Sequence, residues 1–225
     1  MTFSLIGRCD RTGMLGGVVT SSSPAVAARC PWARARVGAA CTQNITDPTL
    51  GPALLDKLER GRSAEHALAD VVAEAPNIEY RQLTVVDLDG RGATFSGEQT
   101  LGRHAARTAP GCAAAGNLLS DEGVPSAMVE AFLAEPSAHL GDRLLRALQG
   151  GRDAGGEGGP VRSSGMIVVD RVPWYVVDLR VDWREDDPIE ELGRLWALWK
   201  PQIHEYVVRA VDPASAPAFG VPGDE

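Results

Sequence analysis

Lysine is almost absent from this sequence. Only Lys57 and Lys200 occur among 225 residues, and the other 20 of the 22 basic residues are arginine. A catalytic lysine therefore has only two candidates, and both lie in polar segments with helical patterning. Acidic residues outnumber basic ones by 30 to 22, which gives a formal net charge of −8. Nucleic acids and anionic membranes attract an excess of positive charge, so we expect neither as a partner.

Long apolar runs and targeting signals are missing as well. No stretch of the chain approaches the roughly 20 apolar residues that a membrane span requires. The first residues have neither the charged segment nor the apolar segment of a signal peptide. We therefore expect a cytoplasmic protein, and a chain of this length can bury a sizeable core in one domain.

Cysteine motifs and the common catalytic signatures are also absent. The four cysteines are scattered, with no C-x-x-C and no histidine at ligand spacing, which favours buried thiols over a zinc site or a disulfide framework. There is no G-x-S-x-G, no Walker A motif, no H-E-x-x-H, and no G-x-G-x-x-G after a strand. The sequence therefore predicts no metal and no cofactor.

The secondary structure that is present alternates between groups of strands and pairs of helices. The predicted strands cover 3–8, 15–21, 36–42, 81–88, 92–95, 112–118, 166–170 and 175–181. The predicted helices cover about 49–59, 63–75, 125–134, 138–149 and 187–199, and six glycines make 150–162 a loop. Paired strands between helix pairs favour an α+β fold in which antiparallel sheets lie between helix layers. We expect one domain over 1–211 and a disordered, proline-rich tail over 212–225.

Thr2 has a chemical property that no other residue of the chain can have. Methionine aminopeptidase removes Met1 when the second residue is small, and the mature chain then begins with threonine. An N-terminal threonine combines a hydroxyl nucleophile with its own α-amino base, whose ordinary pKa is about 7.7 to 8.0. Many proteins begin Met-Thr without catalytic consequence, so this feature needs support from its context.

The context resembles a known family. A hairpin that starts at Thr2, a strand of small residues and two helix pairs are similar to the four-layer αββα sandwich of the N-terminal nucleophile (Ntn) hydrolases, which include proteasome β subunits. Over residues 2 to 199 the chain resembles the bacterial domain of unknown function 1028 (DUF1028) family, which is grouped with those hydrolases. The matching stretches are 2–8 (TFSLIGR), 12–16 (TGMLG), 31–39 (PWARARVGA), 42–43 (TQ), 116–119 (GNLL) and 177–182 (VDLRVD).

This resemblance implies roles for matching positions. Thr2 is the implied nucleophile. The stretch that holds Gln43 and Asn44 lies where proteasome-like enzymes place the backbone N–H that stabilises the oxyanion. Asn117 lies where a polar side chain supports the N-terminal amine, although a turn or cap role suits it equally. Thr20 or Ser21 falls near the place of an acidic residue that this chain lacks.

Other positions leave alternatives open. Arg34 is the nearest cation where proteasome subunits carry a lysine, so it could lower the pKa of the amine or hold an anionic substrate, or it could be an ordinary residue at a strand edge. Asp153 resembles an aspartate of proteasome subunits, whereas the family favours an aspartate where Glu157 stands, and either carboxylate could orient Thr2. Ser163 stands where we expect glutamine, and Trp183 begins a pair that replaces the usual Asp-His.

Two functions follow from these features. The first is an amidohydrolase that cuts a C–N amide bond of a small, anionic substrate through a threonyl ester. The second is a non-catalytic, oligomeric small-molecule-binding protein on the same fold, which the missing acid and lysine favour. We expect a homo-oligomer in either case, with the apolar cluster around Trp196 either at the interface or packed on the sheet.

Overall fold

Two antiparallel sheets form the centre of the computed structural model, which describes residues 1–221. The six-stranded sheet contains, in spatial order, β10 (Tyr175–Val181), β9 (Ser163–Val169), β2 (Leu15–Ser21), β1 (Thr2–Arg8), β8 (Cys112–Asn117) and β7 (Ala105–Ala109). The four-stranded sheet contains β3 (Pro31–Arg34), β4 (Gly38–Asn44), β5 (Arg81–Asp87) and β6 (Gly92–Ser96). All neighbouring strands are antiparallel.

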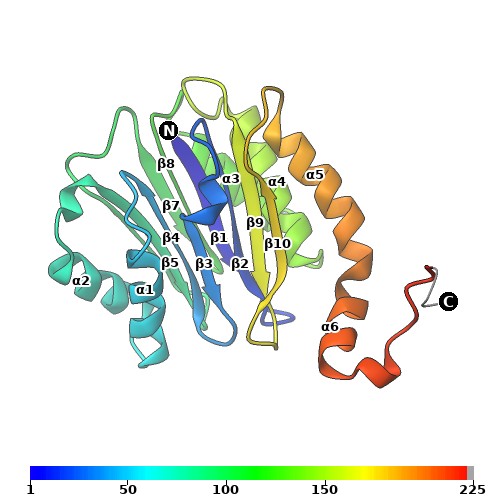
Figure 1. The fold of residues 1–225 in the computed structure, drawn as a ribbon. Coiled ribbons are helices and arrows are strands. Elements are labelled where there is room, and N and C mark those ends of the chain that lie inside the picture. The colour runs from blue at the N-terminus through cyan, green and yellow to red at the C-terminus, as the bar shows by residue number, and fades with distance from the viewer. Residues whose placement is uncertain (222–225) are drawn as a thin grey trace.

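Helices cover the outer face of each sheet (Figure 1). The helices α1 (Leu50–Glu59) and α2 (Ala64–Glu74) pack on the four-stranded sheet. The helices α3 (Val124–Leu133), α4 (Leu140–Asp153) and α5 (Pro188–Trp199) pack on the six-stranded sheet, and α6 (Ile203–Val211) follows α5 at the side of the sandwich. The predicted αββα sandwich of antiparallel sheets is confirmed.

The alternation of side chains along β1 assigns each residue to one of two cores. Phe3 and Leu5 point toward the helix layer, where they join the apolar cluster formed with α3, α4 and α5. Ile6 points the other way, into the cluster between the two sheets. Because successive side chains of a strand alternate between its faces, Thr2 and Ser4 also lie on the inter-sheet side. The first strand therefore carries polar side chains into the interior at its N-terminal end.

Three elements escaped the sequence prediction. The short strand β3 and the edge strand β7 lack the β-branched alternation that identifies strands, and β7 (AARTA) is largely exposed. The helix α6 follows a turn at Lys200–Gln202, so the predicted helix ends at Trp199 and a second helix begins.

The glycine-rich segment is also partly different from the prediction. The helix α4 continues through Gly150 and Gly151 to Asp153, although glycines were expected to end it at residue 149. A Cβ at Gly151 would lie 2.8 Å from Met128 Cγ and 3.0 Å from the Phe3 ring. Glycine is therefore present here because the helix approaches its neighbours closely, and burial overrides its low helix propensity.

The predicted buried thiols agree with the structure, and side-chain caps begin two of the helices. The Ser63 side chain accepts a hydrogen bond from the His66 N–H at 3.4 Å and caps α2, and Asp187 caps α5. All four cysteines are buried and unbridged. Within residues 1–221, no helix is long and apolar enough to cross a membrane, and no group of side chains could hold a metal ion.

The C-terminal segment packs against α6 as far as the structure describes it. Residues Pro213–Ser215 form a 3₁₀ turn, and the Phe219 ring lies 6.2 Å from the Tyr206 ring and beneath the Arg209 guanidinium. The last four residues of the predicted disordered tail, 222–225, lie outside the described part of the chain.

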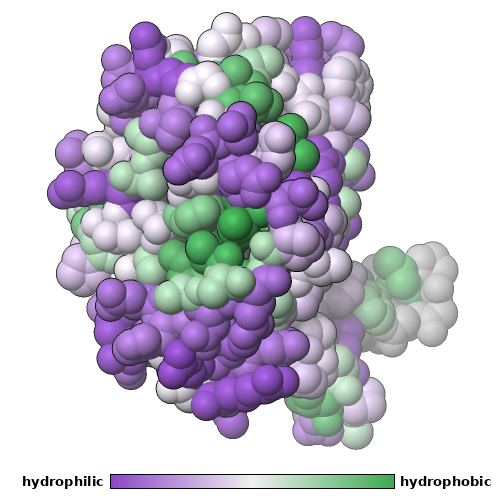
Figure 2. Space-filling model, turned by 90° about the vertical axis from the view of Figure 1, so that its left-hand side faces the viewer, coloured by the Kyte–Doolittle hydropathy of each residue, from purple (hydrophilic) through white to green (hydrophobic). Residues whose placement is uncertain are grey.

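Figure 2 shows the side of the sandwich that lies on the left in Figure 1. Apolar side chains gather near the middle of this face, and polar and charged side chains surround them. The edge strands β6 and β7 of the two sheets end the sandwich on this side. Every residue of β6 is only half-buried, in contrast to the fully buried strands β2 and β8.

The packing of α5 on α4 generates a prediction about two helical glycines. A Cβ at Gly141 would lie 2.5 Å from the ring of the buried Trp196, whereas a Cβ at Gly193 would lie 3.6 Å from its nearest neighbour, Leu145. Urea denaturation should show that Gly141→Ala lowers the free energy of unfolding by ~1–3 kcal/mol through overpacking. The control Gly193→Ala should raise it by up to ~1 kcal/mol, because alanine favours helix. Equal effects of the two substitutions would contradict this packing.

Candidate active site

Thr2 lies at the start of a strand that is paired on both sides. Its neighbours in the sheet are Ser21, at the end of β2, and Asn117, at the end of β8. Directly opposed residues of antiparallel strands point to the same face, so all three side chains gather on the inter-sheet side. Thr2 is only 6% exposed. The sheet therefore fixes the position of Thr2 and surrounds it with polar side chains.

A line of hydroxyl groups runs from Thr2 to the carbonyl group of Met1. Thr2 Oγ1 donates to Ser21 Oγ at 3.3 Å, and Ser21 Oγ donates to the carbonyl oxygen of Met1. Thr2 Oγ1 also lies within hydrogen-bonding distance of the same carbonyl oxygen. The backbone N–H of Ser23 donates to Ser21 Oγ at 3.1 Å and orients it. With Met1 attached, the nitrogen of Thr2 is an amide and cannot act as a base.

The glycine-rich loop brings Glu157 to this end of the sheet. Gly155 and Gly156 have φ angles of 109° and 58°, which favour glycine, and they turn the chain back after α4. Backbone hydrogen bonds from Gly158 to Leu118 at 2.9 Å, together with a bridge between Leu119 and Glu157, then attach the loop to the end of β8. Asp153 instead stays at the end of α4, exposed, in an ion pair of 2.9 Å with Arg152. Of the two candidate carboxylates, the structure brings only Glu157 toward Thr2.

The carboxyl group of Glu157 is buried and incompletely paired. Only 6% of the Glu157 residue is exposed, so it is 94% buried. Glu157 Oε2 accepts from the backbone N–H of Ser22 at 3.3 Å, while Oε1 is buried with no hydrogen-bond partner among residues 1–221. Burial raises the pKa of Glu157 to about 7, although the positive N-terminus favours the ionised form. The group can therefore change its charge near neutral pH.

A network of buried amide groups joins the two sheets below Thr2. Ser4 Oγ donates to Gln43 Oε1 at 2.6 Å, and Gln43 Nε2 donates to Gln82 Oε1 at 2.8 Å. Asn117 Nδ2 donates to the same Gln82 oxygen at 3.2 Å. Asn117 Oδ1 is buried without a partner in the described chain. The network thus fixes the orientation of the Asn117 amide and leaves its oxygen unpaired, in the residue directly opposite Thr2 on β8.

Two predicted substrate-binding residues are held by other partners. Asn44 has a left-handed φ of 74°, and its side chain donates to the Tyr80 carbonyl at 2.6 Å and accepts from the Leu101 N–H at 3.2 Å. Arg34 pairs in register with Gly38, at the opposite end of β4 from Gln43. Its guanidinium forms ion pairs of 2.9 Å and 2.6 Å with two carboxylates of α1, Asp56 and Glu59. The structure does not bring Arg34 to Thr2, so the reason for expecting an anionic substrate is gone.

The structure also locates the two lysines and the two positions, Ser163 and Trp183, at which the sequence departs from the family pattern. Lys57 and Lys200 form ion pairs with Glu74 and Asp142, at 2.6 Å and 2.8 Å, away from Thr2. Ser163 is buried, donates to the Ser23 carbonyl at 2.6 Å and accepts from Val26 N–H, so it supports the segment that follows Ser21. Trp183 is 53% exposed.

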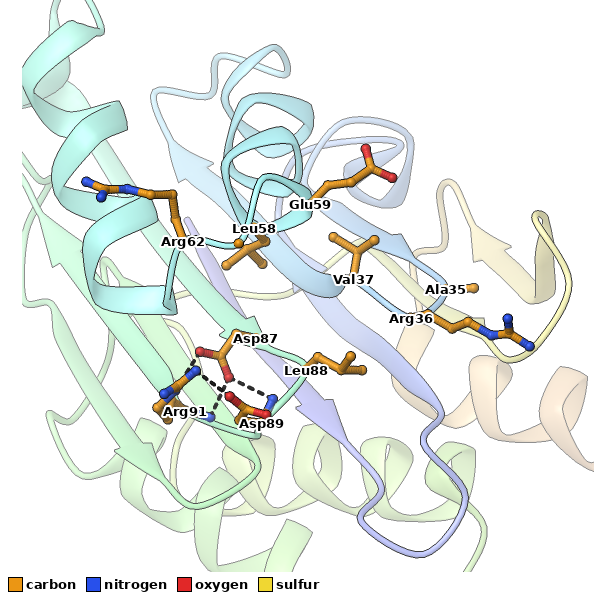
Figure 3. A pocket seen from close by; sticks show the side chains of 11 residues that line it. Ala35, Arg36, Val37, Leu58, Glu59, Arg62, Asp87, Leu88, Asp89 and Arg91 are labelled. Atoms are coloured by element: carbon orange, nitrogen blue, oxygen red, sulfur yellow. Dashed lines mark hydrogen bonds and ion pairs between the residues drawn. The ribbon is translucent and has the colours of Figure 1, made fainter.

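A cavity of about 480 Å³ lies at the end of the four-stranded sheet that is opposite to Gln43 and Gln82 (Figure 3). Asp87 is its only buried carboxylate, and it accepts from the N–H groups of Ala64, Asp89 and Arg91 at 3.0 Å and from Arg91 Nε at 2.8 Å. Although burial alone would raise its pKa, these donors hold the pKa of Asp87 below its ordinary value. Asp87 therefore caps α2 and closes a turn, and the cavity offers no unpaired reactive group comparable to Thr2.

Sequence reasoning missed three contributors to the site. Gln82 could have been noticed as a glutamine beside the apolar residues of a buried strand. Ser4 could have been noticed because it shares the face of Thr2 two residues later. The backbone N–H of Ser22 gave no signal, because its role depends on where the distant loop of Glu157 folds.

Comparison with known proteins places the chain in a family. The sequence profile described as "Family of unknown function (DUF1028)" matches residues 2–192. The chain belongs to the DUF1028 family. A crystal structure of a DUF1028 protein from Silicibacter pomeroyi is similar to it, with 30% identity, a TM-score of 0.81 and 88% of each chain covered. The family resemblance inferred from the sequence is confirmed.

Other comparisons add little to this DUF1028 assignment. Anbu, an ancestral β-subunit from Yersinia bercovieri, matches with 9% identity and a TM-score of 0.39, covering 91% of this chain and 97% of the other. That likeness is too weak to support a conclusion. No curated protein matches the chain.

The amide network predicts a specific loss of stability. Gln82→Met keeps the length of the side chain but leaves Gln43 Nε2 and Asn117 Nδ2 buried without their acceptor. Chemical denaturation should show a decrease of ~2–4 kcal/mol in the free energy of unfolding of this DUF1028 protein. The exposed Gln99 provides the matched control, since Gln99→Met should change it by less than ~0.5 kcal/mol. A neutral Gln82→Met would show that the network does not stabilise the sandwich.

The buried carboxyl group predicts a pH-dependent stability. Because its folded pKa of about 7 exceeds the ordinary value of 4.5, Glu157 contributes no penalty below pH 4.5, a penalty that grows between pH 4.5 and about 7, and a constant penalty above that. Glu157→Gln should remove this loss, so that between pH 4.5 and 8 the variant gains up to ~3 kcal/mol relative to wild type. Asp153→Asn, at an exposed carboxylate, should leave the pH dependence of unfolding unchanged. The same slope in wild type and Glu157→Gln would contradict the assignment.

Proposed function

We propose that this protein is an N-terminal-threonine amidohydrolase that cleaves a C–N amide bond of a small substrate. One observation carries the proposal: Thr2 is fixed by strands on both sides, with the Ser21 hydroxyl beside its own and Asn117, whose side-chain oxygen is unpaired, directly opposite it on β8. These are the groups that a threonine nucleophile needs once Met1 is removed.

The reaction would begin with the α-amine of Thr2. Removal of Met1 converts the amide nitrogen of Thr2 into an amine, which can take the proton of Thr2 Oγ1 while the oxygen attacks the substrate carbonyl carbon. Asn117 Oδ1, buried and unpaired, is the acceptor that would orient the resulting ammonium group. The amide network formed by Gln82 and Gln43 supports Asn117 in this role.

Ser21 is the proposed donor to the developing oxyanion. Its hydroxyl already donates to the carbonyl oxygen of Met1, which occupies the place of an acyl group beside Thr2 Oγ1. A donor in this position contributes ~3 kcal/mol to the stability of a tetrahedral transition state. The C–N bond then breaks as the ammonium of Thr2 returns its proton to the leaving amine. Water hydrolyses the threonyl ester, releases the acid and restores the hydroxyl group.

The lysine content supports the use of the α-amine as base. Both lysines are engaged in ion pairs away from the site, and the Arg34 guanidinium, which cannot act as a base, is held at the far end of β4. The proposal therefore depends on removal of Met1.

Intact mass and covalent labelling test the proposal together. We expect the protein isolated from cells to lack Met1 and to gain the mass of one β-lactone probe on Thr2. Thr2→Ala should abolish labelling and Thr2→Ser should retain it, because only the hydroxyl group is required. Ser21→Ala should slow labelling by ~10²–10³-fold with the melting temperature as the control for folding.

Two outcomes would overturn the proposal. The first is a mature chain that retains Met1, since its blocked amine leaves the threonine without a base. The second is a processed chain whose Thr2 is not labelled. Either result would favour the alternative, a non-catalytic small-molecule-binding protein on the same fold.

A further inference from the structure

Met1 occupies the space that an acyl group would take during the proposed reaction. The Met1 carbonyl carbon is bonded to the nitrogen of Thr2, and in a threonyl ester the acyl carbon is bonded to Oγ1 of the same residue. These two atoms sit on adjacent carbons of Thr2, so acyl groups attached to either one occupy the same region. The contacts of Met1 therefore indicate what the acyl half of a substrate would meet.

The carbonyl group of Met1 already has a donor. Ser21 Oγ donates to the Met1 oxygen, and the backbone N–H of Ser23 holds that hydroxyl at 3.1 Å. The donor is thus oriented by the backbone and is available to any acyl oxygen placed there.

The side chain of Met1 lies along the glycine-rich loop. A Cβ at Gly159 would stand 3.4 Å from Met1 Cε and 3.9 Å from Met1 Sδ. Glycine at this position leaves room for an unbranched side chain as long as methionine, and a larger residue at 159 would narrow it.

The positive charge of the Met1 α-ammonium group acts on an unsatisfied carboxyl group, that of Glu157, without forming an ion pair with it. Glu157 is 94% buried, with Oε2 bonded to Ser22 N–H and Oε1 unpaired within the described chain. Among the interactions that favour its carboxylate form, the positive charge of the Met1 N-terminus is the largest. A buried carboxylate with an unpaired oxygen favours a cation, because a neutral donor can form the hydrogen bond but leaves the buried charge unbalanced, and an anion is repelled.

We propose that this site accepts an α-aminoacyl group, in which Glu157 binds the free α-ammonium, Ser21 the carbonyl oxygen, and the Gly159 region an unbranched, uncharged side chain. This inference rests on the proposed function and specifies its substrate: an amide of an α-amino acid with a free amino group. The leaving amine is not specified by these contacts.

Binding to defined forms of the protein tests this inference without requiring turnover. Cleavable N-terminal fusions can release Thr2→Ala chains that begin either at residue 2 or at Met1. The probes for calorimetry are L-methioninamide, N-acetyl-L-methioninamide and 4-(methylthio)butanamide, which share a side chain and an amide but differ in the α-ammonium. We expect the chain that begins at residue 2 to bind methioninamide at least about tenfold more tightly than either uncharged probe.

Two controls test whether Glu157 causes the preference for the α-ammonium group and whether Met1 fills the same site. Glu157→Gln should reduce the preference to within about twofold, whereas Asp153→Asn should retain it, because Asp153 is exposed at the end of α4. The chain that begins at Met1 should bind none of the probes, since its own first residue fills the site. This second control uses no substitution in the loop and does not depend on the folding of the Glu157 variant.

The inference is overturned if the three probes bind equally, if none binds, if Glu157→Gln keeps the preference, or if the chain with Met1 binds methioninamide. These outcomes are separate from failure of the proposed function, which is measured by β-lactone labelling of Thr2. If Thr2 is labelled but the α-ammonium group gives no preference, the proposed hydrolase activity stands and the proposed substrate class is wrong. If the α-ammonium group is preferred but Thr2 is not labelled, the proposed binding site stands and the proposed catalysis by Thr2 is wrong.

Discussion

The pairing of β1 with a strand on each side is the constraint on which the site depends. A second residue would ordinarily lie in a frayed terminus. Here it is held in register with Ser21 on one side and Asn117 on the other, and it is almost completely buried. The helix α4 and its loop then cover the same end of the sheet and supply Glu157. Ladder hydrogen bonds to two neighbouring strands thus position Thr2, the proposed nucleophile.

Burying polar side chains between the sheets is unfavourable unless they form hydrogen bonds with one another. Ser4, Gln43, Gln82 and Asn117 would each destabilise an apolar core, but each donates to or accepts from another member of the network. The unpaired carboxamide and carboxylate oxygens among the described residues, Asn117 Oδ1 and Glu157 Oε1, belong to residues at the end where Thr2 lies. Buried acceptors without donors are unfavourable in a resting fold and useful where a cation will be bound. Their location is the strongest physical reason to regard this end as functional.

The chemistry proposed for this member of the DUF1028 family relies on a single base. Proximity of Thr2 to Ser21 and Asn117 would have little value while Met1 blocks the amine, so processing of the terminus would switch on both the base and the space for an acyl group. In the unprocessed chain, Met1 fills that space with contacts of its own, from the Ser21 hydroxyl to the Gly159 backbone. The same few residues thus account for how the unprocessed terminus is accommodated and for what the processed one would recognise.

The sequence by itself determined the layered α+β fold and the family, and it singled out Thr2 as the candidate nucleophile. Alternation of apolar residues, turn residues and caps acts over a few positions, so it can be read locally. It could not reveal β7 or the passage of α4 through Gly150 and Gly151, where exposure and close packing decide the structure. Only the tertiary structure showed that Glu157, and not Asp153, lies near Thr2, and that Arg34 lies away from it. Those outcomes depend on how a loop folds over a distant strand end and on which carboxylates an arginine meets, and neither is encoded in local spacing.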